Sequence, residues 1–487
     1  MLILYNPRAA EHKPRIPMSI AALAAVLEGR REYVIVDGNL DPDPVRTIEQ
    51  IVERAPRPHY LLCTVMPGPQ LSRAVPHTRA LKQRYPDLIV VWGGYFPSMH
   101  PEVTLRSGYV DFVAQGQGEH TLLELLDVLE HGGALRDVDG LCYLHDDTMR
   151  RTRPRALTDP NELPRFPYHR LPMERYLGRT FMGRRTVCHH SSVACPFPCS
   201  FCAVIKVYGR AWLAETATRM HDTLQYLQRT YGVDAVEFYD NNFFTQEART
   251  VEFAERVRGM GISWWGEGRI DTLLRYSERS WALMRDAGLR SIFMGAESGS
   301  AAALAEMKKN PLKVHETLAM AERCEAYGIV PEFSFVLGNP RDPHQDIVES
   351  IAFIYEVKKL SPRSEISLYL YTPMPGGDMY EQAVARGFAY PETLEEWVSD
   401  RWLRFSSMRD PGTAWLQAQD IQLVHDFEAV LNAHFPSHTD IKLTRWQRRL
   451  LHALSWPRYR LRVYGHPLEL RTALARVRYR HVQQEGF

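Results

Sequence analysis

Residues 194–203 read Ala194-Cys-Pro-Phe-Pro-Cys-Ser-Phe-Cys-Ala203, and they hold three of the seven cysteines of this 487-residue chain. Three thiols grouped this closely predict a metal site. Zinc would require a fourth ligand, for which His189 or His190 stands just upstream. Three thiolates can also hold three irons of a cubane cluster and leave the fourth iron open. The other four cysteines are scattered and fit packing positions: Cys63, Cys142, Cys188 and Cys324.

Alternating apolar runs and helical patterns surround this cysteine loop, and six βα units over residues 181–395 fit a parallel barrel, either partial or closed. Helical patterns such as Thr216 to Tyr231 and Thr245 to Met260 separate the strands. The cysteine loop follows the first strand, where such barrels carry their chemistry. The predicted strands lie near residues 185–189, 234–239, 262–266, 291–295, 332–337 and 365–371.

Residues 1–145 form a second α/β unit in this interpretation, a doubly wound, Rossmann-like domain of about five parallel strands. Continuous apolar runs such as Leu2 to Tyr5 and Leu88 to Trp92 indicate strands buried on both faces. Ligands bind outside the carboxyl ends of such strands, so the strand-end loops form a candidate pocket. The residues singled out there are Thr64, Met66, Gly93, Gly94, Gly116, Gln117, Gly118 and Glu119.

The remaining segments carry weaker signals. Residues 146–180 are rich in proline and arginine and are predicted to be a linker. Residues 396–487 are predicted to form a helical, basic C-terminal domain, in which Glu469 and Glu485 are the only acids after Lys442. Aromatic residues such as Trp446 and Trp456 lie among its arginines, so this part could lie on an anionic membrane surface. It could equally be a helix pair that caps the barrel with a solvated basic face.

The composition excludes several classes of protein. Lys and Arg total 59 against 58 Asp and Glu, so there is no global field to favour nucleic acid as a partner. No apolar run reaches the length of a membrane span, and the residues after Met1 lack the pattern of a signal peptide. The few cysteines suit a reducing compartment, so we expect a cytoplasmic protein.

The cysteine spacing, with Phe201 before the last cysteine and a βα barrel around it, resembles the radical S-adenosylmethionine (SAM) superfamily. This resemblance implies that Cys195, Cys199 and Cys202 are catalytic and bind a 4Fe-4S cluster, whose open iron chelates SAM and whose electron cleaves it to a 5′-deoxyadenosyl radical. Later strand ends are similar to motifs of the same superfamily. Together with Phe201, they supply the candidate SAM residues Asp240, Glu267, Arg269, Glu297 and Ser298, with the carboxylates as acceptors and Arg269 as a cation.

The N-terminal glycine-rich loops resemble the cobalamin-binding domain of cobalamin-dependent radical SAM proteins, and the resemblance covers roughly residues 1 to 390. Glycines let backbone groups approach a flat corrin ring closely. The chain departs from the Asp-x-His-x-x-Gly motif, because Asp37-Gly38-Asn39 has asparagine where the histidine would stand. Either cobalamin binds without a histidine below its cobalt, or the domain only shapes the substrate pocket. The lone Cys63 argues against a methylthiotransferase, which would need a second three-cysteine cluster.

Three functions follow from this pattern. The first is cobalamin-dependent C-methylation of an unactivated carbon, with SAM consumed in both roles. The second is a radical oxidative cyclase or rearrangement enzyme of the tetrapyrrole ring-forming type, and the third is a non-catalytic iron-sulfur sensor. We expect a small-molecule substrate, an electron donor such as flavodoxin or ferredoxin, and no nucleic acid. Aromatic residues at the barrel strands, among them Trp264, Trp265 and Tyr371, would suit a large hydrophobic or natural-product substrate.

Overall fold

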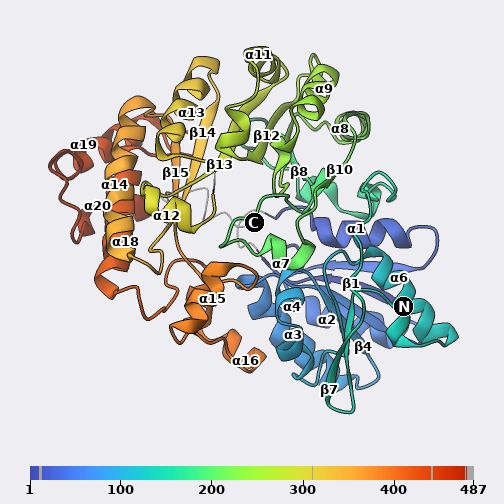
Figure 1. The fold of residues 1–487 in the computed structure, drawn as a ribbon. Helices are drawn as coiled ribbons and strands as arrows, with labels where there is room; N and C mark the ends of the chain where they lie inside the picture. Colours follow the sequence, from blue (N-terminus) through green and yellow to red (C-terminus); the bar gives the residue numbers. More distant parts are fainter. Residues whose placement is uncertain (10–13, 310, 440–441, 478, 480–487) are drawn as a thin grey trace.

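The computed structural model describes residues 1–9, 14–309, 311–439, 442–477 and 479. Two parallel sheets dominate it, the N-terminal sheet at the lower right of Figure 1 and the second sheet above it, with the C-terminal helices at the left. Across these residues, none of the helices combines the length and the apolar character that a membrane span needs.

The N-terminal sheet has the strand order β2-β1-β3-β4-β5-β6-β7. Its first five strands pair in parallel, which confirms the predicted sheet. The order changes direction between β1 and β3, and this switch point is where open α/β sheets bind ligands. The bounds are β1 Leu2–Asn6, β2 Tyr33–Asp37, β3 Tyr60–Thr64, β4 Ile89–Gly93 and β5 Phe112–Ala114.

Helices cover both faces of this sheet, as a doubly wound fold requires. Successive side chains of β1 point to opposite faces. Ile3 and Tyr5 therefore join the core under α2 and α3, whereas Leu2 and Leu4 join the core under α1 and α6. The bounds are α1 Met18–Leu27, α2 Pro44–Arg54, α3 Pro69–Arg84, α4 Tyr95–Met99, α5 Pro101–Leu105 and α6 Glu119–His131.

An antiparallel hairpin, β6 Leu141–His145 and β7 Thr148–Arg151, extends the sheet beyond β5. Its two turn residues, Asp146 and Asp147, have φ of 48° and 57°, as tight hairpins require. The predicted linker therefore begins with an edge strand. The sequence pattern did not reveal it, because β7 is largely exposed and has no apolar alternation.

The second sheet contains six parallel strands in the order β15-β14-β13-β12-β11-β8, so the barrel is partial, with β8 and β15 at its edges. Each strand lies within three residues of its predicted position at either end. The strands are β8 Thr186–His189, β11 Ala235–Phe238, β12 Ser263–Gly268, β13 Leu289–Glu297, β14 Val330–Leu337 and β15 Glu365–Leu370. The short strands β9 Ser192–Val193 and β10 Leu213–Ala214 pair beside the cysteine loop.

Most helices of the barrel pack against the outer face of this sheet, whereas the short helix α7 lies beside α4 of the N-terminal unit. Their bounds are α7 Val204–Tyr208, α8 Ala217–Tyr231, α9 Glu247–Val257, α10 Ile270–Leu273, α11 Glu278–Asp286, α12 Ala301–Glu306, α13 Val314–Tyr327 and α14 Pro343–Leu360.

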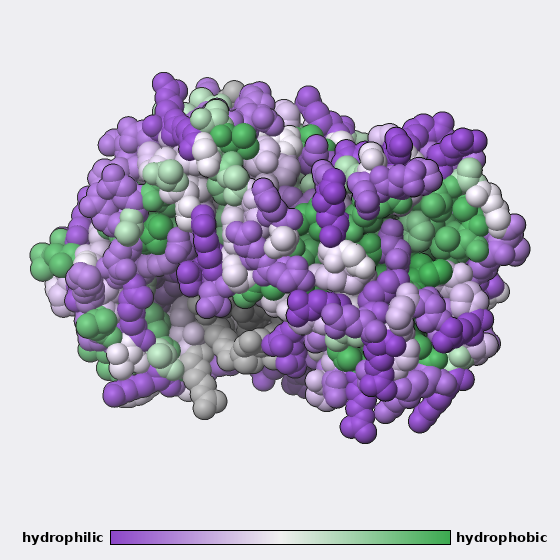
Figure 2. Space-filling model, turned by 90° about the horizontal axis from the view of Figure 1, so that it is seen from below, coloured by the Kyte–Doolittle hydropathy of each residue, from purple (hydrophilic) through white to green (hydrophobic). Residues whose placement is uncertain are grey.

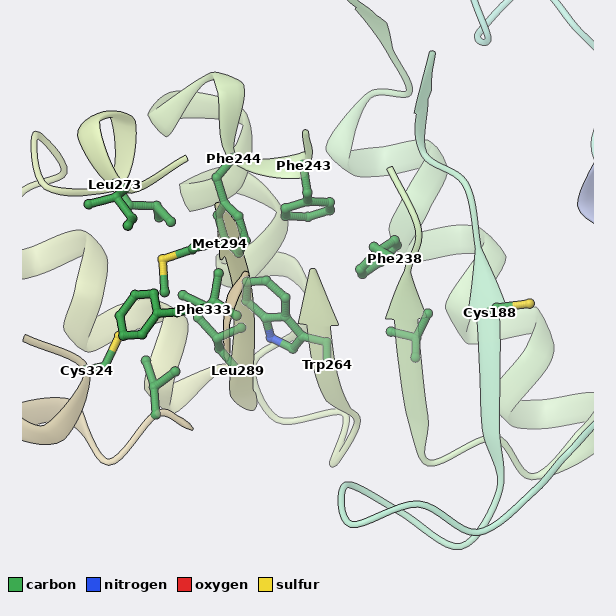
Figure 3. Close-up of a cluster of buried hydrophobic side chains, with 14 of the residues drawn as sticks. Cys188, Phe238, Phe243, Phe244, Trp264, Leu273, Leu289, Met294, Cys324 and Phe333 are labelled. Atoms are coloured by element: carbon green, nitrogen blue, oxygen red, sulfur yellow. The ribbon is translucent and has the colours of Figure 1, made fainter. Parts of the chain in front are cut away.

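Figure 3 shows the core between the sheet and these helices, with Phe238, Trp264 and Phe333 among its members. Cys188 and Cys324 also belong to this core, and Cys63 and Cys142 are buried in the N-terminal unit. The expectation that Trp264 lines a substrate pocket is wrong, because its side chain points into the helical layer. The four scattered cysteines are packing residues.

The C-terminal part is helical, as predicted, but it contacts both sheets. Trp397 and Trp402 of α16 and α17 join the core of the N-terminal unit, whereas Phe427 of α18 packs on the barrel. A domain boundary at residue 396 therefore stays a prediction. The bounds are α15 Asp378–Ala385, α16 Leu394–Trp397, α17 Asp400–Ser406, α18 Ala418–His434, α19 Arg445–Leu461 and α20 Leu468–Arg476.

Candidate functional site

The cysteine loop follows β8 and β9. It contacts the segments that follow β13 and β15. The backbone N–H of Ser200 donates to the carbonyl of Met307 at 3.0 Å, and its hydroxyl donates to the carbonyl of Glu306 at 2.8 Å. A Cβ at Gly377 would lie 1.9 Å from the carbonyl oxygen of Ser200, so only glycine allows this approach. The loop therefore has a defined seat before any metal binds.

Cys199 is buried, and Cys195 and Cys202 are partly buried. Burial raises the pKa of the Cys195 thiol and raises that of Cys202 to about 12, so proton release must accompany metal binding. Among the described residues, no group of three or more His, Cys, Asp or Glu side chains is arranged to hold a metal ion. The cysteines as cluster ligands stay a prediction, which rests on three thiols of one loop and on the charges around them.

Arg269 lies beside this loop, on the segment after β12. Its Nη1 donates to Cys199 Sγ at 3.2 Å, its Nε donates to Asp271 at 2.9 Å, and its Nη2 donates to the carbonyl of Lys309 at 3.0 Å. The guanidinium also lies 4.1 Å from the ring centre of Phe197. Burial disfavours its charge, but Cys199 and Asp271 outweigh this effect and raise the pKa of Arg269. The geometry supplies a fixed positive charge next to one predicted cluster ligand.

A second buried ion pair, between Lys309 and Glu297, lies next to Arg269. Lys309 Nζ lies 2.5 Å from the Glu297 carboxylate, and both side chains are buried. Glu297 has φ of 64°, and a Cβ at Gly295 would collide with its carboxylate. Burial disfavours the ammonium charge, but Glu297 and Cys199 raise the pKa of Lys309. Glu297 thus neutralises a lysine near the cysteine loop in this structure.

Asp240, which follows β11, fixes the backbone that leads into the cysteine loop. Its two carboxylate oxygens accept from the backbone N–H of Ser191 at 2.6 Å and from the Ser191 hydroxyl at 2.5 Å. Arg249 donates to the same hydroxyl at 2.7 Å. Asp240 therefore shapes the backbone between β8 and β9, and a direct contact with SAM stays a prediction.

Glu267 lies at the end of β12 and is partly exposed, unlike Asp240. Burial and the neighbouring Asp240 raise its pKa to about 8, although Arg15 opposes the shift. A carboxyl group that is neutral near pH 7 can donate as well as accept a hydrogen bond. The other two predicted SAM acceptors, Asp240 and Glu297, are engaged in contacts within the protein. Glu267 is therefore the acceptor that is most available to SAM.

Ser298 and Phe201 take structural positions. The Ser298 hydroxyl is bonded to Asp346, whose other oxygen accepts from the backbone N–H of Gly338 at 2.9 Å. These contacts join the end of β13 to the end of β14. Phe201 is partly buried and packs against Met307 and Tyr371. The structure therefore uses both residues to fix the surroundings of the site.

The switch point of the N-terminal sheet is built from small side chains and backbone. The hydroxyls of Ser19 and Thr64 lie 3.0 Å apart, and the N–H of Met66 donates to Gln70 at 2.7 Å. The Met66 side chain is 41% exposed. Gly94 has φ of 98°, and a Cβ there would lie 2.9 Å from the Val65 carbonyl, whereas at Gly93 it would meet only ordinary contacts. This edge offers a close, uncharged backbone surface, which fits a flat corrin.

The loop after β5 is tied to its surroundings in a similar way. The side-chain oxygen of Gln117 accepts from the backbone N–H of Thr158 at 2.7 Å, so Gln117 anchors the following segment. Gly118 precedes α6, and Glu119 begins that helix, where burial raises its carboxyl pKa. Gly116 has φ of 71°, and a Cβ there would lie 3.2 Å from the carbonyl of Val207 in α7.

The residues that depart from the histidine motif are engaged within the domain. The Asn39 side-chain oxygen accepts from the N–H of Ala9 at 2.9 Å. Asp37 accepts from Asn6 at 2.8 Å and from the hydroxyl of Tyr176 at 2.7 Å. Asn39 therefore holds the loop after β1 rather than standing in a histidine's place.

The two strand-end edges meet at the helix that follows Cys202. Tyr95, which begins α4 after β4, packs edge-on against Tyr208 at the end of α7, with ring centres 5.8 Å apart. Its hydroxyl donates to the Asn241 side chain at 3.2 Å. α4 and α7 accordingly lie side by side in the centre of Figure 1. The cysteine loop and the glycine-lined edge thus belong to one site between the two sheets.

Sequence reasoning missed several members of this site. Phe197 lies within the cysteine loop, Lys309 lies in the segment after the fourth barrel strand, and Tyr95 directly follows the paired glycines 93 and 94. A buried lysine cannot be recognised without its partner Glu297. The position of Tyr95 after a strand end was the one local signal for its place between the sheets.

Residues 14–126 match the family model of the B12 binding domain. The chain is 27% identical over 375 residues to an uncharacterized methyltransferase of Pyrococcus horikoshii, with 76% of this chain and 78% of that protein covered. It is 26% identical over 303 residues to an anaerobic magnesium-protoporphyrin IX monomethyl ester cyclase of Synechocystis, with 60% of this chain and 59% of that protein covered.

One similar solved structure is the radical SAM methyltransferase TsrM from Kitasatospora setae, determined with cobalamin and its 4Fe-4S cluster. The match has a TM-score of 0.66 and covers 98% of both chains at 16% identity. This likeness confirms the predicted fold class, in which an N-terminal Rossmann-like domain, a partial barrel and C-terminal helices follow one another.

Proposed function

We propose that the chain belongs to the cobalamin-dependent radical SAM proteins and that it is an enzyme that methylates an unactivated carbon of a small-molecule substrate. Its cofactors are a 4Fe-4S cluster, SAM and cobalamin. The observation that carries this proposal is the contact between Tyr208, on the helix after the three-cysteine loop, and Tyr95, next to the paired glycines of the B12 binding domain.

When bound, the cofactors supply a 5′-deoxyadenosyl radical that removes a hydrogen atom from the substrate and a methyl group that replaces it, each derived from one SAM. The protein's residues hold and orient these groups. Cys195, Cys199 and Cys202 are the ligands of the cluster, and Arg269 beside Cys199 offsets its negative charge. Glu267 is the acceptor for the SAM ammonium or ribose. Backbone groups at Thr64, Gly93 and Gly94 receive the corrin.

Other partners follow from this chemistry. The cluster must receive single electrons, so we assign a donor of the flavodoxin or ferredoxin kind and a cytoplasmic location. A large hydrophobic or natural-product molecule is the substrate class, because Trp265 and Tyr239 line the inner face of the barrel with ring centres 5.2 Å apart. The predicted peripheral membrane contact belongs to the C-terminal helices.

The decisive experiment supplies the anaerobically reconstituted full chain with hydroxocobalamin, SAM, a strong reductant and any substrate that it accepts. We expect both 5′-deoxyadenosine and S-adenosylhomocysteine, because SAM serves as radical source and as methyl donor. A chain that forms 5′-deoxyadenosine without S-adenosylhomocysteine fits a cyclase and contradicts methylation.

The matched control omits cobalamin. The methylation proposal requires that this omission abolish S-adenosylhomocysteine while SAM cleavage to 5′-deoxyadenosine persists. A protein whose cluster spectrum does not respond to SAM would instead be a sensor.

A further inference from the structure

The outward side of α19 is unusually apolar for a surface helix. Trp446 is 69% exposed, and Leu450 and Leu454 follow it at intervals of four residues on the same side. Trp456 borders this stripe, and Leu461 ends it with 71% of its surface exposed. These large side chains form a continuous apolar strip along the whole helix.

The inner side of α19 is firmly packed, so the direction of the strip is set by the fold. Leu451 and Ser455 are buried. The ring of Tyr459 stacks on His434 of α18 and on Tyr355 of α14, with ring centres 4.2 Å and 4.4 Å apart. Thr444 caps the helix through the N–H of Gln447. The helix therefore has a buried face of its own in addition to the apolar strip.

The strip continues around the turn into α20. Arg462 takes a left-handed conformation, with φ of 56°, and reverses the chain. Val463, directly after Arg462, and Leu468, at the start of α20, are 53% and 69% exposed. Figure 2 shows hydrophobic residues reaching the surface at its left edge, the side on which Figure 1 places α19 and α20.

Positive charge accompanies the strip. Arg449 and Arg460 are exposed on the same side of α19 as Trp446, and Arg445 is exposed in the first turn of the helix. Glu469 is the only acidic residue between 442 and 479, and it is paired with Arg458. Long arginine side chains can bury their stems in an apolar layer and keep their charge in a polar one. Tryptophan favours the boundary between such layers.

We propose that α19 and the turn into α20 lie in the surface of an anionic lipid bilayer. The apolar strip enters the acyl boundary, and the three arginines contact lipid phosphates. A helix with large apolar and basic residues and almost no acid has the composition of interfacial helices. The inference deepens the peripheral membrane contact of the proposed function, on which it rests, and it requires neither SAM nor a metal.

The test measures sedimentation of the full chain with vesicles of phosphatidylcholine, alone or with one third phosphatidylserine, in the absence of SAM. We expect binding to the anionic vesicles that weakens with salt. Changing Arg445, Arg449 and Arg460 together to Gln should weaken binding about a hundredfold, because each basic residue near such a surface contributes about a factor of five. The change Trp446→Ser with Leu450→Ser and Leu454→Ser should weaken it at least as much.

Two matched variants control for loss of charge or apolar surface elsewhere. Arg30, Arg258 and Arg279 are exposed, and Val348 and Val384 are 42% and 43% exposed outside this face. Changing the three arginines together to Gln, or the two valines together to Ser, should leave vesicle binding intact. Thermal melting of every variant separates lost binding from lost folding. Equal binding of the α19 variants and wild type overturns the proposal. So does a wild-type dimer in solution that the α19 variants break, since a second copy would then cover the strip.

Discussion

The two sheets meet at the carboxyl ends of their parallel strands, but the residues at these two edges differ in kind. The barrel edge places charged side chains in buried contact, with Arg269 against Asp271 and Lys309 against Glu297. The N-terminal edge relies on glycine conformations and on backbone groups around Thr64 and Gly94. A negatively charged cluster and zwitterionic SAM need fixed charges, whereas a corrin needs a close, flat surface. Each edge thus has the chemistry of one cofactor.

The largest effect that separates the edges should come from Cys199→Ala. Loss of one thiolate ligand removes the cluster, so iron and sulfide content and SAM cleavage should fall to background. Absorbance of the bound corrin should remain, because its predicted contacts lie on the other sheet. A matched change, Cys324→Ala, removes a buried core thiol and should keep the cluster. Loss of corrin in the Cys199 variant would show that the two edges are not independent.

Arg269→Met tests the charged edge itself. This change removes the buried partner of the Asp271 carboxylate. The free energy of unfolding should therefore fall by about 3–5 kcal/mol. Urea unfolding of the variant and wild type measures the difference. Arg275 also contacts Asp271, at 3.4 Å, but its side chain is 66% exposed. Arg275→Gln should therefore cost less than about 1 kcal/mol. Equal costs for both arginines would contradict the assigned role of burial.

Gly94→Ala tests the glycine-lined edge. At φ of 98° and 2.9 Å from the Val65 carbonyl, an added Cβ should cost about 2–3 kcal/mol and lower corrin retention. The cluster content should stay unchanged. Gly93→Ala is the control, because its Cβ would meet its nearest neighbour at 3.7 Å. Corrin absorbance after gel filtration compares the two variants, and an equal loss in both would argue against a specific role of Gly94.

Per pH unit, the smallest expected change in stability belongs to the barrel. Burial and the nearby Glu365 raise the pKa of Glu332 to about 8, above its value in an unfolded chain. The neutral carboxyl therefore stabilises the fold at low pH, and this contribution is lost as pH rises from about 5 to 8. Glu332→Gln should flatten this decline by up to about 1.4 kcal/mol per pH unit in urea unfolding.

The amide oxygen of the introduced glutamine can replace the carboxyl oxygen of Glu332, which accepts from Trp265 Nε1 at 3.1 Å and from the Ser291 hydroxyl at 2.5 Å. The surface change Glu255→Gln should retain the wild-type slope. An unchanged slope in the Glu332 variant would place the pH dependence elsewhere.

The sequence by itself determined the local features of this protein. The cysteine loop, both parallel sheets and the strand-end glycines follow from spacing and apolar periodicity, which depend on neighbouring residues. The hairpin at β6 and β7 escaped this reasoning, because an exposed edge strand needs little apolar alternation.

Only the tertiary structure decided which charges stand beside Cys199. Arg269 and Lys309 are distant from it in the sequence, and they reach it because the ends of neighbouring parallel strands meet at one edge. The tertiary structure also turned Asp240 and Ser298 toward internal partners, placed α16 and α17 in the N-terminal core, and directed the apolar strip of α19 outward. Such contacts depend on the topology of the whole chain, which local periodicity does not encode.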